Sequence, residues 1–338
     1  ETKSQDGATM LFFRKIFSMF VLVLAFCSAL RAEKRPLLVL SGPPAAVSFP
    51  LAYMVASGSL SDLARRIEFK TWMTPDQLRS MALGKEADFL AMPSNVAANL
   101  YNRGAPVRLV NISTWGILWM VSRGKPRGTL ADFKGQEIAM PFRGDMPDVV
   151  FGLLAAKQGL STADFVLRYV ASPLDAMQLL LMRRVDHALL AEPAISMALR
   201  RSGSFPLKLV APELSRSLSL QKEWGRLYAR SEEMPQAGIV AVGQASGDRA
   251  LIKEIHRRYT VALKECQRDP DGCSRKIQPL LSRLMPEAIA DSIRISPLRS
   301  VTTADAAAEL KFFLGQLYAK EPALLGGKLP SENFYHWP

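Results

Sequence analysis

Motifs of known catalytic and cofactor sites are missing from this sequence of 338 residues. It has no Gly-x-Ser-x-Gly elbow, no phosphate-binding loop, no dinucleotide fingerprint and no His-Glu-x-x-His motif. Only three histidines are present, and one of them, His187, alternates with apolar residues in a strand-like run. A structural histidine explains that pattern more simply than a general base does. We therefore expect no catalytic residue and no cofactor.

Cysteine is also scarce, with three residues in the whole chain. Cys27 lies in an N-terminal apolar segment, which leaves Cys266 and Cys273 as an even pair. The turn sequence Gln-Arg-Asp-Pro-Asp-Gly separates them and joins two helical patterns. In an oxidising compartment we expect a disulfide between these two cysteines. A metal site is not expected, because two thiols without a nearby histidine supply too few ligands.

Near the N-terminus, the apolar run is too short to span a bilayer, which takes about 20 apolar residues. Arg14 and Lys15 precede this run, Ile16–Phe26, and small residues follow it. That order is typical of a secretory signal peptide, with cleavage after Ala29 or Ala32 fitting equally well. We assign residues 1–32 to the signal peptide and upstream sequence, and predict export to the periplasm. Phe26 is too bulky for a lipoprotein signal, so no lipid anchor is expected at Cys27.

Runs of basic residues interleaved with aromatics are lacking, although the formal charge is +12 and the pI is about 9.8. The lysines and arginines are scattered, with only short pairs such as Arg65-Arg66. A nucleic-acid partner is therefore not expected. The positive charge either favours anionic partners through long-range attraction or reflects a basic proteome. With 49% apolar residues, the chain is long enough for two globular domains.

What the sequence does contain is one pattern that occurs twice. A strand-like run is followed by a polar residue and proline, a helical pattern, and a second apolar run that begins at an aspartate and ends at a proline. The spacing from Pro75 to Asp88 equals that from Pro173 to Asp186. The two copies are Ile67–Trp72, Thr74-Pro75 and Asp88–Asn95, then Phe165–Ala171, Ser172-Pro173 and Asp186–Pro193.

This repetition predicts an α/β fold of two similar lobes, each a mixed sheet flanked by helices, with a cleft between them. We expect the first lobe to begin at 33–115, the second to occupy 116–240, and 241–338 to return to the first lobe with C-terminal helices. Two extended runs, Gly116–Val121 and Gly238–Val242, are predicted to cross between the lobes side by side. Outside the two copies of the pattern we expect helices at Ala46–Ser57, Asp148–Lys157, Asp248–Cys266, Ser274–Leu284 and Ala304–Leu317, and a strand at Leu207–Val210.

The candidate ligand-binding residues lie in loops that connect strands to helices. Such loops converge on the cleft of a two-lobed α/β protein and supply amides, hydroxyls and a few charges. We predict that the following residues bind a ligand: Ala46, Ser48, Trp72, Thr74, Pro93, Ser94, Asn95, Trp115, Arg143, Asp145 and Glu192.

Each of these assignments has a structural alternative. Serines and threonines in such loops commonly cap helices. Arg143 is the cation best placed for an anionic group, or else it faces solvent. Trp115 either stacks on a ligand or packs the hinge, and Glu192 either binds an amine or holds a turn.

Four segments resemble a known protein family. They are Gly84–Ser94, Leu130–Ala139, Asp186–Pro193 with its Glu-Pro, and Gly326-Gly327-Lys328-Leu329-Pro330. In order and spacing they are similar to the substrate-binding proteins of ABC importers for nitrate, sulfonates, taurine and thiamine-precursor pyrimidines. The resemblance covers essentially the whole mature chain and implies the type II periplasmic binding fold.

The resemblance implies a monomeric receptor that closes on a small, anionic or heterocyclic organic solute and delivers it to an ABC permease and its ATPase. Closure would be a hinge motion about the two crossing runs. Met92 and the sequence Arg143-Gly144-Asp145 depart from the pockets of the family. These departures argue against a bare inorganic anion and leave a sulfonate or a heterocyclic solute open.

Two other functions are compatible with the same resemblance. One is a periplasmic sensing module that presents its ligand to a membrane receptor. The other is an enzyme on the same fold, similar to pyrimidine synthases or enzymes of the menaquinone pathway. Because those enzymes are cytoplasmic, the predicted export signal favours a receptor without enzymatic activity.

Overall fold

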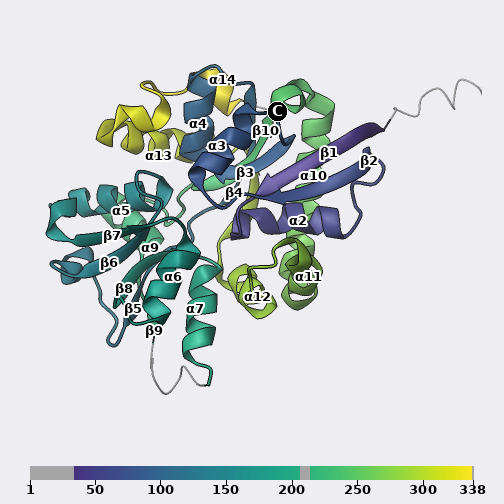
Figure 1. The fold of residues 1–338 in the computed structure, drawn as a ribbon. Coiled ribbons are helices and arrows are strands. Elements are labelled where there is room, and N and C mark those ends of the chain that lie inside the picture. The colour runs from purple at the N-terminus through teal and green to yellow at the C-terminus, as the bar shows by residue number, and fades with distance from the viewer. Residues whose placement is uncertain (1–33, 206–213, 337–338) are drawn as a thin grey trace, which may run out of the picture.

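Strands of the chain gather into two separate mixed sheets, each covered by helices (Figure 1). The structure is a computed structural model that describes residues 34–205 and 214–336. The predicted signal peptide, Cys27 and the predicted strand Leu207–Val210 lie outside the described residues. None of the helices in the described ranges combines the length and apolar character needed to cross a bilayer.

The first sheet has six strands in the order β11-β4-β10-β3-β1-β2. Here β1 is parallel to β2 and β3, whereas β10 is antiparallel to β3 and β4, and β11 is antiparallel to β4. The strand bounds are β1 (Arg35–Gly42), β2 (Ala64–Thr71), β3 (Phe89–Pro93), β4 (Val107–Thr114), β10 (Ala237–Val242) and β11 (Leu298–Thr302).

The second sheet has five strands in the order β7-β6-β8-β5-β9. Strand β6 is parallel to β7 and β8, and β5 is antiparallel to β8 and β9. The bounds are β5 (Leu118–Arg123), β6 (Glu137–Pro141), β7 (Val166–Val170), β8 (His187–Ala191) and β9 (Leu214–Ser219). The prediction of a two-lobed α/β fold with a mixed sheet in each lobe is confirmed.

Helices cover both sheets and continue into a helical C-terminal region (Figure 1). The α-helices are α2 (Phe49–Ala56), α3 (Pro75–Leu83), α4 (Ser94–Asn102), α5 (Met146–Lys157), α6 (Pro173–Leu181), α7 (Ala194–Ser202), α9 (Leu220–Tyr228), α10 (Arg249–Arg268), α11 (Pro270–Ile277), α12 (Pro286–Ile295), α13 (Ala307–Lys320) and α14 (Glu332–Tyr335). Short 3-10 helices are η1 (Ala46–Ser48), η2 (Leu130–Phe133), η3 (Thr162–Asp164), η4 (Gly243–Gly247), η5 (Gln278–Leu280) and η6 (Pro322–Leu325).

The duplicated pattern forms the same structure in both lobes. It gives β2-α3-β3-α4 in the first lobe and β7-α6-β8-α7 in the second. Strands β3 and β8 are almost entirely buried, as expected for short apolar runs in the middle of a sheet. Proline occupies the first position of both α3 and α6, where its missing N–H has no intrahelical partner to lose.

Strand β10 corrects the predicted pairing of the crossing runs. It lies between β3 and β4 in the first sheet and does not pair with β5. The boundary expected at residue 240 therefore falls inside this strand. Sheet order depends on contacts far apart in the sequence, and β10 alone carries no signal of the strands beside it.

The first crossing is not a continuous strand, because residues 115–117 separate two strands. Strand β4 ends at Thr114 and β5 begins at Leu118. Gly116 between them has φ +116°, a conformation that favours glycine, and a Cβ there would lie 2.8 Å from the Gln221 Cβ. Backbone hydrogen bonds from Met234 to Trp115 (3.1 Å) and from Gln236 to Thr114 (3.0 Å) tie the return segment to this crossing. The two crossings therefore lie side by side, as predicted. The contact is made by residues 234–236, which precede β10, and not by β10 itself.

Several predicted helices have different bounds. The helix expected at Ala46–Ser57 is divided into η1 and α2, and α5 begins at Met146, before the expected Asp148. The turn between the cysteines is shorter than predicted, since α10 ends at Arg268 and α11 begins at Pro270. The disulfide Cys266–Cys273 joins these two helices, as predicted.

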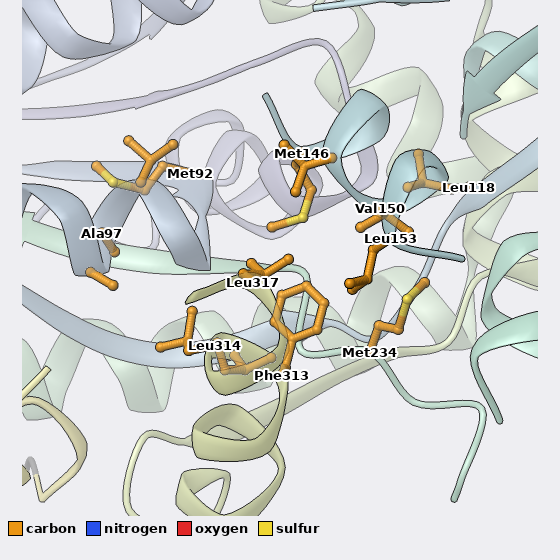
Figure 2. Packing of buried hydrophobic residues seen from close by; sticks show 14 of the residues in the cluster. Met92, Ala97, Leu118, Met146, Val150, Leu153, Met234, Phe313, Leu314 and Leu317 are labelled. Carbon is orange, nitrogen blue, oxygen red and sulfur yellow. The ribbon is translucent and has the colours of Figure 1, made fainter. Parts of the chain in front are cut away.

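The two lobes share hydrophobic clusters with the C-terminal region. Figure 2 shows one of them, where Met92 from the first lobe, Met146 and Val150 from α5, and Phe313 and Leu317 from α13 belong to a single buried group. Helix α13 packs against α5 of the second lobe and against η6, which in turn packs against α4 of the first lobe. The Arg79–Asp145 ion pair also joins the two lobes.

Candidate functional site

A cavity of about 110 Å³ lies where the two lobes meet. The first lobe contributes the loops after β1, β2 and β3, and the second contributes the loops after β6, β7 and β8. Both crossings complete the wall. The residues that line it are Pro43, Pro44, Ala45, Val47, Trp72, Met73, Pro75, Leu78, Met92, Pro93, Val96, Thr114, Ile117, Leu118, Phe142, Asp145, Met146, Pro147, Ser172, Pro173, Leu174, Ala191, Glu192, Ala194, Gln236 and Ala237.

The lining is predominantly apolar. Six of its residues are prolines, and Trp72, Met92, Phe142 and Met146 add large apolar side chains. The polar residues are Thr114, Asp145, Ser172, Glu192 and Gln236. Among the described residues, no lysine, arginine or histidine lines the cavity.

Four amides in the loops around the cavity have hydrogen-bond partners within the protein. At the start of α3, the Thr74 hydroxyl accepts from the Gln77 amide (3.3 Å), and the Gln77 side chain accepts from the Met73 amide (2.7 Å). At the start of α6, the Ser172 hydroxyl accepts from the Asp175 amide (3.3 Å). The Ser94 amide at α4 donates to the Gln236 carbonyl (3.0 Å). These four amides are therefore not free to bind an anion.

Glu192 is held by a buried ion pair. Its side chain is 2% exposed, and its Oε1 accepts from the Arg216 Nη2 at 2.7 Å. Its Oε2 accepts from the Ser196 hydroxyl (2.8 Å) and amide (3.2 Å). The Glu192–Pro193 peptide bond is cis. All of these partners belong to the second lobe. The Glu192 carboxylate is therefore held at the start of α7 by its own lobe.

Asp145 joins the two lobes across the cavity. It precedes α5 in the second lobe, and its Oδ1 accepts from the Nη2 of Arg79, on α3 of the first lobe, at 2.8 Å. Burial raises the pKa of the Asp145 carboxyl above its ordinary value of 3.8, with nearby Asp76 and Asp148 adding to the rise, and outweighs the lowering effect of Arg79. This arrangement thus binds a proton at the Asp145 carboxyl more readily than a solvent-exposed aspartate does.

This raised pKa predicts how stability changes with pH. The folded chain binds the Asp145 proton more tightly than the unfolded chain, so this contribution to stability is full below 3.8 and is lost as pH rises through the raised pKa. We expect the unfolding free energy of the wild type, minus that of Asp145→Asn, to decrease from about pH 4 to about pH 7. Chemical denaturation of both proteins at pH 4 and pH 7 measures this difference. If the difference increases over that range, the pKa of Asp145 is not raised in the folded chain.

Four of the predicted binding residues line the cavity, namely Trp72, Pro93, Asp145 and Glu192. Trp72 is nearly buried, and its ring N–H donates to the Ala91 carbonyl at 3.1 Å. Pro93 ends β3 and precedes α4. The structure therefore brings together residues from four of the predicted loops at one cavity.

The other seven predicted residues do not line it. Ala46 and Ser48 are buried behind the loop after β1, and Thr74 caps α3. The Ser94 hydroxyl donates to the Pro235 carbonyl at 2.6 Å, and Asn95 lines a neighbouring side cavity. Trp115 packs in the hinge, with its ring N–H donating to the Arg299 carbonyl. Arg143 is exposed, with its guanidinium 4.9 Å from the centre of the Tyr169 ring.

Other residues seen at the cavity were not singled out from the sequence. Arg79 and Arg216 engage its two carboxylates, and Thr114 and Gln236 line the wall at the crossings. The position of Thr114 directly before Trp115, a predicted binding residue, was a usable signal. No spacing in the sequence connects Arg79 with Asp145 or Arg216 with Glu192.

His187, which the sequence predicts to be structural, can also be placed. His187 is buried, and burial lowers its pKa, so that the imidazole is neutral at physiological pH. Its Nδ1 lies 3.0 Å from the Ser122 hydroxyl, away from the cavity lining. Within residues 34–205 and 214–336, no group of three or more histidine, cysteine, aspartate or glutamate side chains is arranged to hold a metal ion.

Solved structures of transport and binding proteins have the same architecture. An ABC transporter structure from Parabacteroides distasonis superimposes with a TM-score of 0.71, at 20% identity over 89% of this chain and 99% of that one. The fold is that of a periplasmic solute-binding protein. The aliphatic sulphonate-binding protein SsuA of Escherichia coli has the same fold, with a TM-score of 0.67, 15% identity and coverage of 90% and 93%. The nitrate-binding protein NrtA of Synechocystis PCC 6803 superimposes with a TM-score of 0.65, at 11% identity over 85% of this chain and 82% of that one.

These structures are binding proteins and not enzymes, and their fold confirms the one implied by the resemblance. No protein-family model matches the sequence, and no curated protein matches it. At such low identities the comparison establishes the fold, and the ligand must be argued from the cavity itself.

Proposed function

We propose that this chain is the periplasmic solute receptor of an ABC importer, which binds a small organic molecule between its lobes and delivers it to a permease and its ATPase. The observation that carries the proposal is the apolar cavity built from corresponding loops of two similar lobes. The fold of importer binding components supports it. Both carboxylates at the cavity are engaged by arginines, which supports recognition and not catalysis.

Closure is the step that would couple binding to delivery. The crossings at 115–117 and 229–236 run side by side, and the Ile117 amide donates to the Gln236 side chain at 3.2 Å. Arg79 and Asp145 form a contact between the lobes at the edge of the cavity. A solute enclosed by both lobes adds contacts that the open form lacks, so it shifts the population toward the closed form.

A co-purified or added solute should stabilise the chain. We expect native mass spectrometry of gently purified protein to show a bound small organic molecule. Added back at about 100 times its Kd, this solute should raise the unfolding free energy by about 2.7 kcal/mol, measured by thermal denaturation. Deleting the gene should abolish uptake of the same solute by the source cell. If the chain were a sensing module, uptake should continue after the deletion.

A cavity-filling variant tests where the solute binds. Ala191 lines the cavity, and Ala191→Phe should abolish the thermal shift. The control, Val261→Phe, adds bulk at a half-exposed position on α10 and should retain the shift. Equal loss in both variants, or no bound molecule and no uptake defect, would contradict the proposed receptor function.

A further inference from the structure

The charge balance at the cavity points to the kind of solute, given the proposed receptor function. Among the described residues no lysine, arginine or histidine lines the wall, and the amides of Gln77, Ser94 and Asp175 have partners within the protein. An anion leaving water would find no cation in the wall and two carboxylates nearby, so its lost hydration would not be fully replaced.

A cationic solute is disfavoured by the same geometry. The Asp145 carboxylate pairs with Arg79 at 2.8 Å, and the Glu192 carboxylate pairs with Arg216 at 2.7 Å. Each carboxylate is already neutralised by a guanidinium outside the cavity wall. A cation in the cavity would gain little from them and would be repelled by the two arginines behind them.

A buried hydroxyl without a partner among the described residues lies at the cavity where β4 meets the return crossing. Thr114 is fully buried and lines the cavity, and its hydroxyl has no partner among the described residues. Gln236 lies beside it, since its amide donates to the Thr114 carbonyl at 3.0 Å. The Gln236 side-chain oxygen accepts from the Ile117 backbone amide at 3.2 Å. The NH₂ group of the same side chain can therefore donate to a solute.

We infer that the solute is an uncharged, mostly apolar organic molecule with one hydrogen-bond acceptor, such as a carbonyl or a ring nitrogen, bound by the Thr114 hydroxyl and the Gln236 amide group. The prolines, Trp72, Met92 and Phe142 enclose its apolar part. Thr114 is then a specificity-determining residue, because an unpartnered buried hydroxyl is satisfied only by a solute that carries a matching group.

Matched pairs of single-ring compounds test the charge. The probes are benzamide with benzoate, nicotinamide with nicotinate, and benzenesulfonamide with benzenesulfonate, compared with the co-purified solute by thermal shift and calorimetry. We expect neutral members to bind at least about tenfold more tightly than their anions, because the anion loses hydration that the cavity does not replace. The Kd of the co-purified solute should change less than about twofold between low salt and 1 M salt, since no charge pair forms.

The isosteric variant Thr114→Val tests the polar contact. It should weaken binding of the neutral members and of the co-purified solute by about tenfold, the loss of one hydrogen bond. Ser292→Ala is the matched control, because it removes a buried hydroxyl without a partner on α12, outside the cavity lining. Unchanged affinity in Thr114→Val would overturn the assignment of Thr114.

Failure of this inference is distinguishable from failure of the receptor function. Tighter binding of the anionic members, or a co-purified solute that is an anion, would overturn the neutral solute and leave the receptor in place. Absence of any bound molecule, together with no binding of any probe, would overturn both.

Discussion

Replacing Gly238 by alanine is expected to lower the free energy of unfolding by about 3 kcal/mol or more. An added Cβ would lie 1.8 Å from the Asn111 carbonyl oxygen and 2.8 Å from its carbon, both backbone atoms of the neighbouring strand β4. These atoms cannot move without separating β4 from β10 at the centre of the first sheet. Chemical denaturation of the purified variant measures the effect.

The close approach at Gly238 is part of an irregular pairing of the two strands. The register shifts between Ala237 and Gly238 and again between Ile239 and Val240. There the Asn111 side chain accepts from the Ile239 amide at 3.1 Å, replacing a ladder bond. The control is Gly315→Ala in α13, where a Cβ has no atom within 4 Å and helix propensity favours alanine by up to about 1 kcal/mol. Similar destabilisation in both variants would contradict the steric explanation.

Removing the Arg216 guanidinium is expected to destabilise the chain by about 3–5 kcal/mol, the usual cost of leaving a buried charge without its partner. The variant Arg216→Met retains most of the side-chain volume but leaves Glu192, 2% exposed, with Ser196 alone. Because Glu192 lines the cavity, the thermal shift caused by the solute should decrease as well. Both effects are measured by denaturation with and without the solute.

Neutralising the second partner should restore much of this loss. In Arg216→Met combined with Glu192→Gln no buried charge remains, so the double variant should be more stable than Arg216→Met alone. Arg257→Ala is the control, since its ion pair with Glu254 is exposed and contributes less than about 1 kcal/mol. A double variant no more stable than Arg216→Met would show that the charge of Glu192 is not the cause.

The duplicated β-α-β units were predictable because their signals are local. Apolar runs buried on both faces mark β3 and β8, and a polar residue before proline marks the start of α3 and α6. The same signals located Trp72, Pro93, Asp145 and Glu192 at loops that do meet at the cavity. Patterns within about 20 residues were sufficient for these elements.

What the sequence did not reveal depends on contacts between distant segments. The position of β10 between β3 and β4 rests on the approach of Gly238 to Asn111, 127 positions away by their numbers. The pairing of Arg79 with Asp145 spans 66 residues. Since the sequence shows each member only beside its chain neighbours, the character of the cavity could not be derived from residue types at the loops alone.

The prolines around the cavity have a consequence for the thermodynamics of binding. Each fixes its own φ near −65° and restricts the residue before it. Six of them lie in or directly beside five of the loops that form the wall, so these segments have few conformations to lose when a solute is enclosed. Binding should therefore carry a small conformational entropy penalty. A wall that is preorganised in this way does not change shape to fit a larger analogue. The cavity therefore selects its solute by size and shape as well as by polarity.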